Sequence, residues 1–218
     1  MQKSAVQNAE PQKGRGRPKA DELYLADQRV RVYVALEALL AETHSTQISV
    51  EQVLVAACIS RPTFYRWFPE GLATAIEHVI AQANLKLLQE VIAAITAVSD
   101  AEARIHAGIT AYFAWGTRTG PIIKCIYREI FQPDTAAYSH RTQSVQQLAQ
   151  LLSDQSALFG LTGLDASTFE TLISCVEQAG HVAFREATPS PELIAQQCQL
   201  AITIVISTLR AYDTQAKA

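Results

Sequence analysis

The sequence predicts an all-α protein of about nine helices, in which a three-helix headpiece precedes a helical-bundle body. Three observations support this fold class. Apolar residues recur every three or four positions through most of the 218 residues, which is the spacing of one helix face. Proline and glycine interrupt that pattern between segments, and no stretch alternates as a strand does. We expect an arm at 1–20, a headpiece at 21–70 and a body at 71–218.

The arm is polar and rich in glycine and proline, so we expect it to be disordered. It carries the basic run K-G-R-G-R-P-K, in which glycine removes side-chain bulk and proline favours an extended chain. Arg15 and Arg17 resemble the arginines of an AT-hook, which lie in the minor groove of A·T-rich DNA. A solvated tail is the alternative. The segment that follows the arm makes minor-groove binding the better hypothesis.

The headpiece begins with an expected helix at 21–42 and continues into a helical hairpin at 49–68. Ser49 and Gln52 form a capping box at the start of the first short helix. Ser60 caps the second, which has a proline within its first turn, where the missing N–H costs little. These signals predict two short helices joined by a tight turn.

The second short helix presents donors and planar groups to solvent. Phe64 and Phe68 are four residues apart and point inward. The outward side carries no acidic residue, a pattern that suits the DNA major groove. The residues expected to contact bases or phosphates are Arg61, Pro62, Thr63 and Tyr65, with Ser49, Arg66 and Trp67 mainly holding the DNA backbone.

The run S-x-x-Q-V-x-x-x-A-x-I-S-R-P-T-F-Y-R-W-F resembles the helix-turn-helix of the tetracycline-repressor (TetR) family of bacterial regulators. The matching residues are Ser60, Thr63, Phe64, Tyr65 and Phe68, in the same order and spacing. The motif covers about a tenth of the chain. The resemblance implies a cytoplasmic homodimeric transcriptional regulator. The two recognition helices of the dimer would enter successive major grooves, roughly 34 Å apart, of a near-palindromic site in double-stranded DNA. It also implies a repressor that a small-molecule effector releases.

Two positions depart from the family pattern. Cys58 stands in the turn where the family usually has glycine, so we expect a positive φ there at a cost on the order of 1 kcal/mol. The family often has a lysine just after the recognition helix, where it meets a phosphate. This chain has Glu70 in that region, so we expect weaker anchoring on this side.

The body begins with a long expected helix at 71–98, a natural lever between headpiece and body. A second hairpin follows at 101–118 and 120–131. Its aromatic residues are the best candidates for a small-molecule cavity, although ordinary core packing is the alternative for each one. The candidate pocket residues are His106, Tyr112, Phe113, Trp115, Ile126 and Tyr127.

Three further helices are expected at 135–157, 165–186 and 191–212. The last has no charged residue from Leu193 to Leu209, but it is too rich in Gln, Thr and Ser for a convincing membrane span. A helix apolar on most sides must be covered on most sides, here by its own body and by a second copy. The candidate dimer-interface residues are Phe169, Ile173, Val176, Gly180, Ala201, Val205 and Leu209.

Charge is distributed unevenly along the chain. Residues 1–68 hold 9 basic against 7 acidic residues, whereas residues 69–218 hold 9 against 14. Nucleophile, phosphate-loop and metal-binding motifs are absent from the sequence, so we expect no catalytic residue, metal or cofactor. Arg128 and Glu129 are expected to form a solvated pair. The alternatives are a helical enzyme or carrier whose hairpin only mimics a DNA-binding motif, and a DNA-architectural protein.

Overall fold

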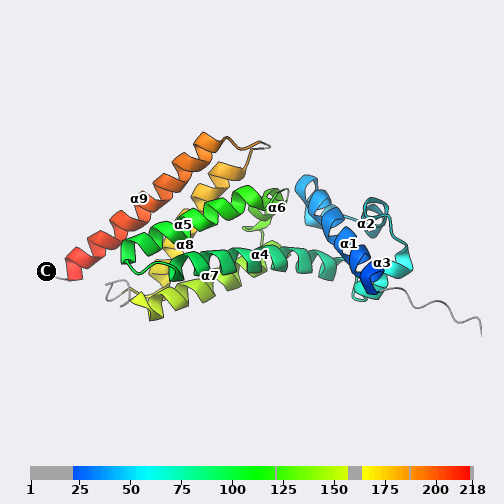
Figure 1. Ribbon diagram of the computed structural model, residues 1–218, viewed down its shortest axis with the longest axis horizontal. Helices are drawn as coiled ribbons and strands as arrows, with labels where there is room; N and C mark the ends of the chain where they lie inside the picture. Colours follow the sequence, from blue (N-terminus) through cyan, green and yellow to red (C-terminus); the bar gives the residue numbers. More distant parts are fainter. Residues whose placement is uncertain (1–21, 121, 157–163, 187, 217–218) are drawn as a thin grey trace, which may run out of the picture.

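The computed structural model describes residues 22–120, 122–156, 164–186 and 188–216. Every regular element in these ranges is helical, which confirms the all-α fold class. Figure 1 shows the elements in their spatial arrangement. They are α1 (Glu22–Glu42), the 3-10 turn η1 (Ser45–Gln47), α2 (Val50–Ala57), α3 (Arg61–Trp67), α4 (Leu72–Thr96), α5 (Ala101–Arg118), α6 (Ile122–Glu129), α7 (Ala136–Asp154), α8 (Ala166–Phe184) and α9 (Pro191–Ala216).

The headpiece, residues 22–68, is held together by a small core under α1, α2 and α3. Leu36, Val53 and Phe64 are 0% exposed and come one from each helix. Phe64 and Phe68 have ring centroids 5.4 Å apart, as their spacing of four residues predicts. These rings fix α3 against the headpiece and leave its other side to solvent.

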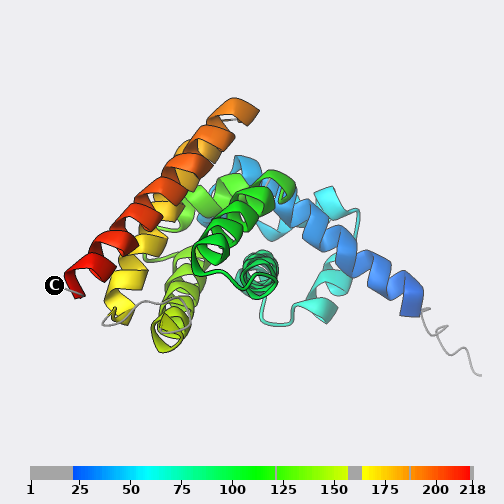
Figure 2. The same ribbon diagram turned by 60° about the vertical axis from the view of Figure 1, so that its left-hand side comes forward.

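Helix α4 runs without interruption from the headpiece into the body (Figure 1). Its 25 residues correspond to a length of about 38 Å. The body, residues 72–216, packs α5 and α7 along α4, while α8 and α9 lie on the far side (Figure 2). Helices α4 and α9 are long and apolar enough to cross a membrane, but core helices pass the same test, so this is weak evidence.

Three helices, α5, α6 and α8, pack closely together in the middle of the body. Tyr112 of α5 and Tyr127 of α6 share a hydrogen bond between their hydroxyls, directly over Gly180 of α8. A Cβ at Gly180 would overlap both hydroxyl oxygens. Burial raises the pKa of both tyrosines, because the phenolate would lose its water. The pair therefore stays neutral and fixes α6 against α5 and α8.

We expect Gly180→Ala to lower the free energy of unfolding by about 1–3 kcal/mol, because the added methyl meets a packed core. Urea unfolding followed by circular dichroism measures the change. Gln178→Ala, on the exposed side of α8, is the matched control and should be nearly neutral. In a background with Tyr112→Phe and Tyr127→Phe the penalty should shrink. An equal penalty in both backgrounds would contradict this account.

Candidate functional site

Helix α3 presents its polar side at the end of the molecule farthest from α9 (Figure 1). Ser60 caps this helix by accepting from the Thr63 N–H, and a proline occupies the first turn. Arg61 and Arg66 are exposed, and Tyr65 is 39% exposed. Thr63 is half-buried, with its hydroxyl oxygen 2.9 Å from that of Ser60. The predicted contact residues on α3 therefore form one outward surface.

Arg61 has an acidic partner in the headpiece itself. Its guanidinium donates to the Glu51 carboxylate at the start of α2, and both side chains are more than half exposed. A hydrogen bond from its own backbone and then the Arg61 guanidinium lower the pKa of Glu51 from its ordinary value. An exposed pair of this kind is weak, so a phosphate can replace the carboxylate as the partner of Arg61.

The other predicted DNA-contact residues are placed differently. The Ser49 hydroxyl and the Gln52 side chain form the expected capping box at the start of α2. Trp67 is half-buried, and its indole Nε1 is fully buried, so that atom is not available to a phosphate. The Trp67 ring lies against the Arg29 guanidinium of α1, 5.8 Å from its centroid, and the expected contact of Trp67 with the DNA backbone stays a prediction. Arg15 and Arg17 lie outside the described residues.

The turn between α2 and α3 contains one residue in the left-handed backbone conformation. Cys58 adopts φ 52° and ψ 49°, the left-handed conformation usually given to glycine. Its N–H bonds back to the carbonyls of Leu54 and Val55, which closes α2. The expected positive φ is confirmed, and Cys58 is the one non-glycine residue with this conformation among those described.

A pair of charged residues at the end of α6 joins the body to the headpiece. Arg128 donates from Nη2 to the carbonyls of Leu40 at 2.6 Å and Thr43 at 2.8 Å, at the C-terminal end of α1. Glu129 is 0% exposed and accepts from the Ser45 N–H at 2.9 Å. A cation at a helix C-terminus and an anion at the start of a turn both suit the backbone dipoles. We call Arg128 and Glu129 the α6 latch.

The expectation of a solvated Arg128–Glu129 pair is therefore wrong. Nothing local in the sequence separates a solvated pair from this one, because its partners lie more than eighty residues away. His44 reinforces the contact, with its Nε2 2.6 Å from the Gln132 side-chain oxygen. The residues on either side of the latch, Tyr127 and Ile130, line the pocket described next.

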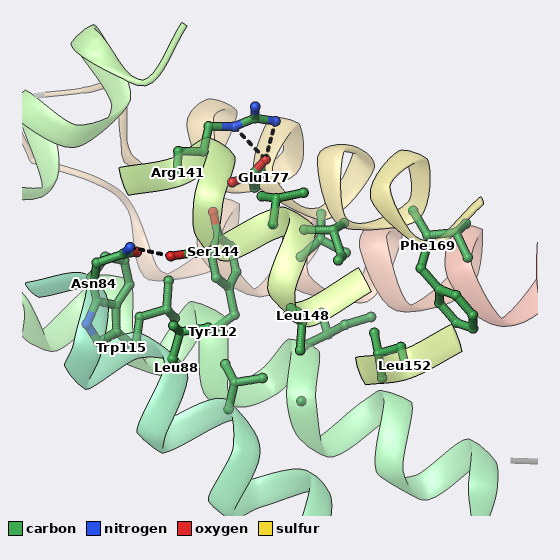
Figure 3. Close-up of a pocket in the computed structure, with 18 of the residues that line it drawn as sticks. Asn84, Leu88, Tyr112, Trp115, Arg141, Ser144, Leu148, Leu152, Phe169 and Glu177 are labelled. Carbon is green, nitrogen blue, oxygen red and sulfur yellow. Dashed lines mark hydrogen bonds and ion pairs between the residues drawn. The ribbon is translucent and has the colours of Figure 1, made fainter. Parts of the chain in front are cut away.

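A pocket of about 190 Å³ lies inside the body, with walls from α4 through α9 (Figure 3). Most of its lining is aliphatic. Among the predicted pocket residues, Tyr112, Trp115, Ile126 and Tyr127 line it.

The predicted residues His106 and Phe113 do not line this pocket. His106 is exposed and its Nδ1 lies 3.3 Å from the Thr110 hydroxyl. Phe113 is buried against Phe184 instead, with ring centroids 6.1 Å apart. Both residues lie on a different side of α5 from Tyr112, which decides which side chains reach the pocket.

The residues predicted for a dimer interface lie on the inner side of α8 and α9. Phe169, Ile173 and Val176, with Val205 and Leu209, line the pocket. Gly180 packs under the tyrosine pair, and Ala201 is 0% exposed. These seven residues therefore pack within their own chain, and a helix with two apolar sides gives no sign in the sequence of which side does so. Their role in a dimer interface stays a prediction. The outer side of α9 carries Leu200, 47% exposed, and Ile204, 39% exposed.

The chain matches no protein-family model. The HTH-type transcriptional regulator EthR of Mycobacterium tuberculosis is 33% identical over 118 residues, which are 52% of this chain and 51% of the relative. EthR of Mycobacterium bovis gives the same values. The chain thus spans about half the length of the curated relatives that it matches.

Two solved structures cover more of the chain. A TetR-family transcriptional regulator from Streptomyces coelicolor superimposes with a TM-score of 0.61 at 19% identity, covering 87% of this chain and 85% of the other. The fatty acid degradation regulator FadR from Bacillus halodurans gives 0.63 at 13% identity, covering 80% and 94%. The likeness to the solved structures shows the fold alone. The predicted resemblance to the TetR family is confirmed, and the chain has the fold of these regulators.

We expect Cys58→Gly to raise the free energy of unfolding by about 1 kcal/mol, because glycine adopts the left-handed backbone without a Cβ penalty. Cys58→Ala removes the thiol but keeps the Cβ, so it should give no such gain. Urea unfolding of the two variants separates the backbone effect from the thiol. Equal stabilities would mean that the turn holds no strain.

We expect Arg128→Leu to lower the free energy of unfolding by about 2 kcal/mol, because the carbonyls of Leu40 and Thr43 lose a charged donor. Amide hydrogen exchange should quicken around Leu40 and Ser45. Lys124→Leu is the control, since it removes the same charge from α6 but breaks only a partly exposed pair with Glu42 at 3.6 Å, which is worth about 1 kcal/mol or less. Equal effects of the two variants would rule out a special role for the latch.

Proposed function

We propose that the protein is a DNA-binding transcriptional regulator, a cytoplasmic homodimeric repressor that a small molecule bound in the body releases from its operator. The observation that carries this proposal is the outward surface of α3, with Arg61, Thr63, Tyr65 and Arg66 at one end of the molecule. A short helix with a positive exposed end fits the major groove, where arginine reads guanine and threonine meets a phosphate or a thymine methyl. The curated relative is itself a transcriptional regulator.

The rest of the interface extends this contact. Helix α4 starts at Gly71 without a side-chain cap, so its first N–H groups can meet a phosphate in place of the missing lysine. Arg15 and Arg17 would add the minor-groove contact on the other side. The residues of the proposed interface are Arg15, Arg17, Arg61, Pro62, Thr63, Tyr65 and Arg66.

A second copy of the chain would cover the outer side of α8 and α9. From Leu193 to Leu209 this side has no charge to keep it in water, and Leu200 and Ile204 project from it. An uncharged face with large apolar side chains is typical of contacts between subunits. Two copies would then present two α3 helices to one near-palindromic site, roughly 34 Å apart.

Release would pass from the pocket to the headpiece through α6 and α4. A ligand that pushes on Ile126 or Tyr127 moves the helix that carries the latch, and α4 lines the same pocket. The ligand favours release only if it binds the released conformation more tightly than the DNA-bound one. The coupling is reciprocal, so DNA should weaken ligand binding by the same factor.

We expect the chain to bind DNA flanking its own gene more tightly than scrambled DNA, with a steep dependence on salt. Fluorescence anisotropy measures both. The double variant Thr63→Ala and Tyr65→Ala should bind at least about tenfold more weakly, because each lost contact costs roughly 1–3 kcal/mol. Thr96→Ala, exposed near the other end of α4, is the control and should bind as the parent does. Parent-like binding by the double variant would refute the assignment of α3.

A further inference from the structure

The lining of the pocket in the body extends over a long stretch of α4. The residues of α4 that face it extend from Ile80 to Ile95. At 1.5 Å per residue this stretch covers about 22 Å of helix axis. Such a site suits an extended ligand better than a compact ring system.

Polar groups gather at one end of the pocket. Figure 3 shows Asn84, Tyr112 and Ser144 together on one side, near Arg141 and Glu177. The Asn84 amide donates to the Ser144 hydroxyl at 2.5 Å and to the His140 carbonyl at 3.3 Å. We call this region the polar end.

The other end of the pocket is lined almost entirely by hydrocarbon. Leu152 and Phe169 lie there in Figure 3, and Ile95 and Ile105 also belong to the pocket lining. Arg104 also belongs to this lining, but its Nε donates to the Val98 carbonyl at 2.6 Å. A polar head and a hydrocarbon tail would each find a matching end.

The charges at the polar end already cancel one another. Arg141 donates from Nε at 3.0 Å and from Nη2 at 2.6 Å to one oxygen of Glu177, and from Nη2 to the Ser174 hydroxyl at 3.2 Å. The two side chains are only 17% and 14% exposed. Burial raises the pKa of Glu177, and the Arg141 guanidinium opposes that shift. A charged ligand head would separate this pair and leave one charge buried without compensation.

The uncharged groups at the polar end match a ligand head group that both donates and accepts hydrogen bonds. Two tyrosine hydroxyls carry two protons, and the bond between Tyr112 and Tyr127 uses one of them. The Ser144 hydroxyl accepts from Asn84 and keeps its own proton to donate. The side-chain oxygen of Asn84 is an acceptor that can face a ligand donor.

We propose that the pocket binds an unbranched, uncharged amphiphile, with a hydrocarbon tail toward Phe169 and a head such as a primary amide or alcohol at Asn84 and Ser144. This inference rests on the proposed function, in which the body binds the effector. It names the chemical class of that effector.

The test compares four probes of one chain length: decanamide, decanol, decanoate and decylammonium. Binding is read by isothermal calorimetry and by Trp115 fluorescence in a Trp67→Phe background, which leaves Trp115 as the only tryptophan. We expect decanamide and decanol to bind at least about tenfold more tightly than either charged probe. Tightest binding by decanoate or decylammonium would overturn the proposal, and so would no binding by any of the four.

Variants at the polar end show how much of the affinity comes from contacts with the ligand head group and how much from burial of its tail. Asn84→Leu and Ser144→Ala should each weaken decanamide by about tenfold or less, because each removes one hydrogen-bond partner. Gln143→Ala, exposed on α7, is the matched control and should leave the affinity unchanged. Unchanged decanamide affinity in both polar-end variants would overturn the placement of the head.

The parent protein, with Trp67 in place, is tested by calorimetry with the same probes and for binding to the DNA that flanks its gene. Probe binding without DNA binding would refute the regulator and keep the ligand class. DNA binding without probe binding would refute the ligand class and keep the regulator. The two proposals therefore fail in distinguishable ways.

Discussion

The contact between the headpiece and the body depends on a buried carboxylate. Glu129 is wholly covered, and burying a charge is costly unless hydrogen bonds and an opposite charge compensate. The Ser45 N–H and the Arg128 guanidinium, 3.5 Å away, compensate Oε1, whereas Oε2 is buried without a hydrogen-bond partner among the described residues. These contacts join the end of α6 to the C-terminal end of α1 and to η1. The same helix lines the pocket through Tyr127, so the site and the headpiece share a rigid element.

The pocket owes its two unlike ends to the directions in which its helices run. Ser144 on α7 lies beside Asn84 on α4, and Arg141 lies beside Glu177 on α8. Each helix places its polar residues at one end of the pocket and its aliphatic residues a few helical turns away. Buried polar groups need hydrogen-bond partners, and here they find them in one another, which gathers them at a single place. The tyrosine pair over Gly180 also lines the pocket.

The sequence allowed the headpiece site to be predicted because its determinants are local. The cap at Ser60, the inward Phe64 and the left-handed Cys58 all act within one hairpin, and the side of α3 that faces outward follows from them. The clustering of aromatic residues in the second hairpin of the sequence predicted Tyr112 and Trp115 as pocket residues. His106 was not excluded, because composition does not show which side of α5 meets α4. No local sequence pattern predicted the contacts of the latch or the Asn84–Ser144 hydrogen bond, since each joins residues far apart in the chain.

The amino-acid sequence by itself determined that the chain is helical, where most helices begin and end, and that a helix-turn-helix lies near its start. Helix period, caps and breakers act over a few residues, so they can be read without a partner. Only the tertiary structure decided which apolar side of α8 and α9 faces the body, and that Glu129 is buried rather than solvated. Those outcomes depend on how helices cross and which side chains then meet, and a helix with two apolar sides is compatible with either orientation until its neighbours are placed.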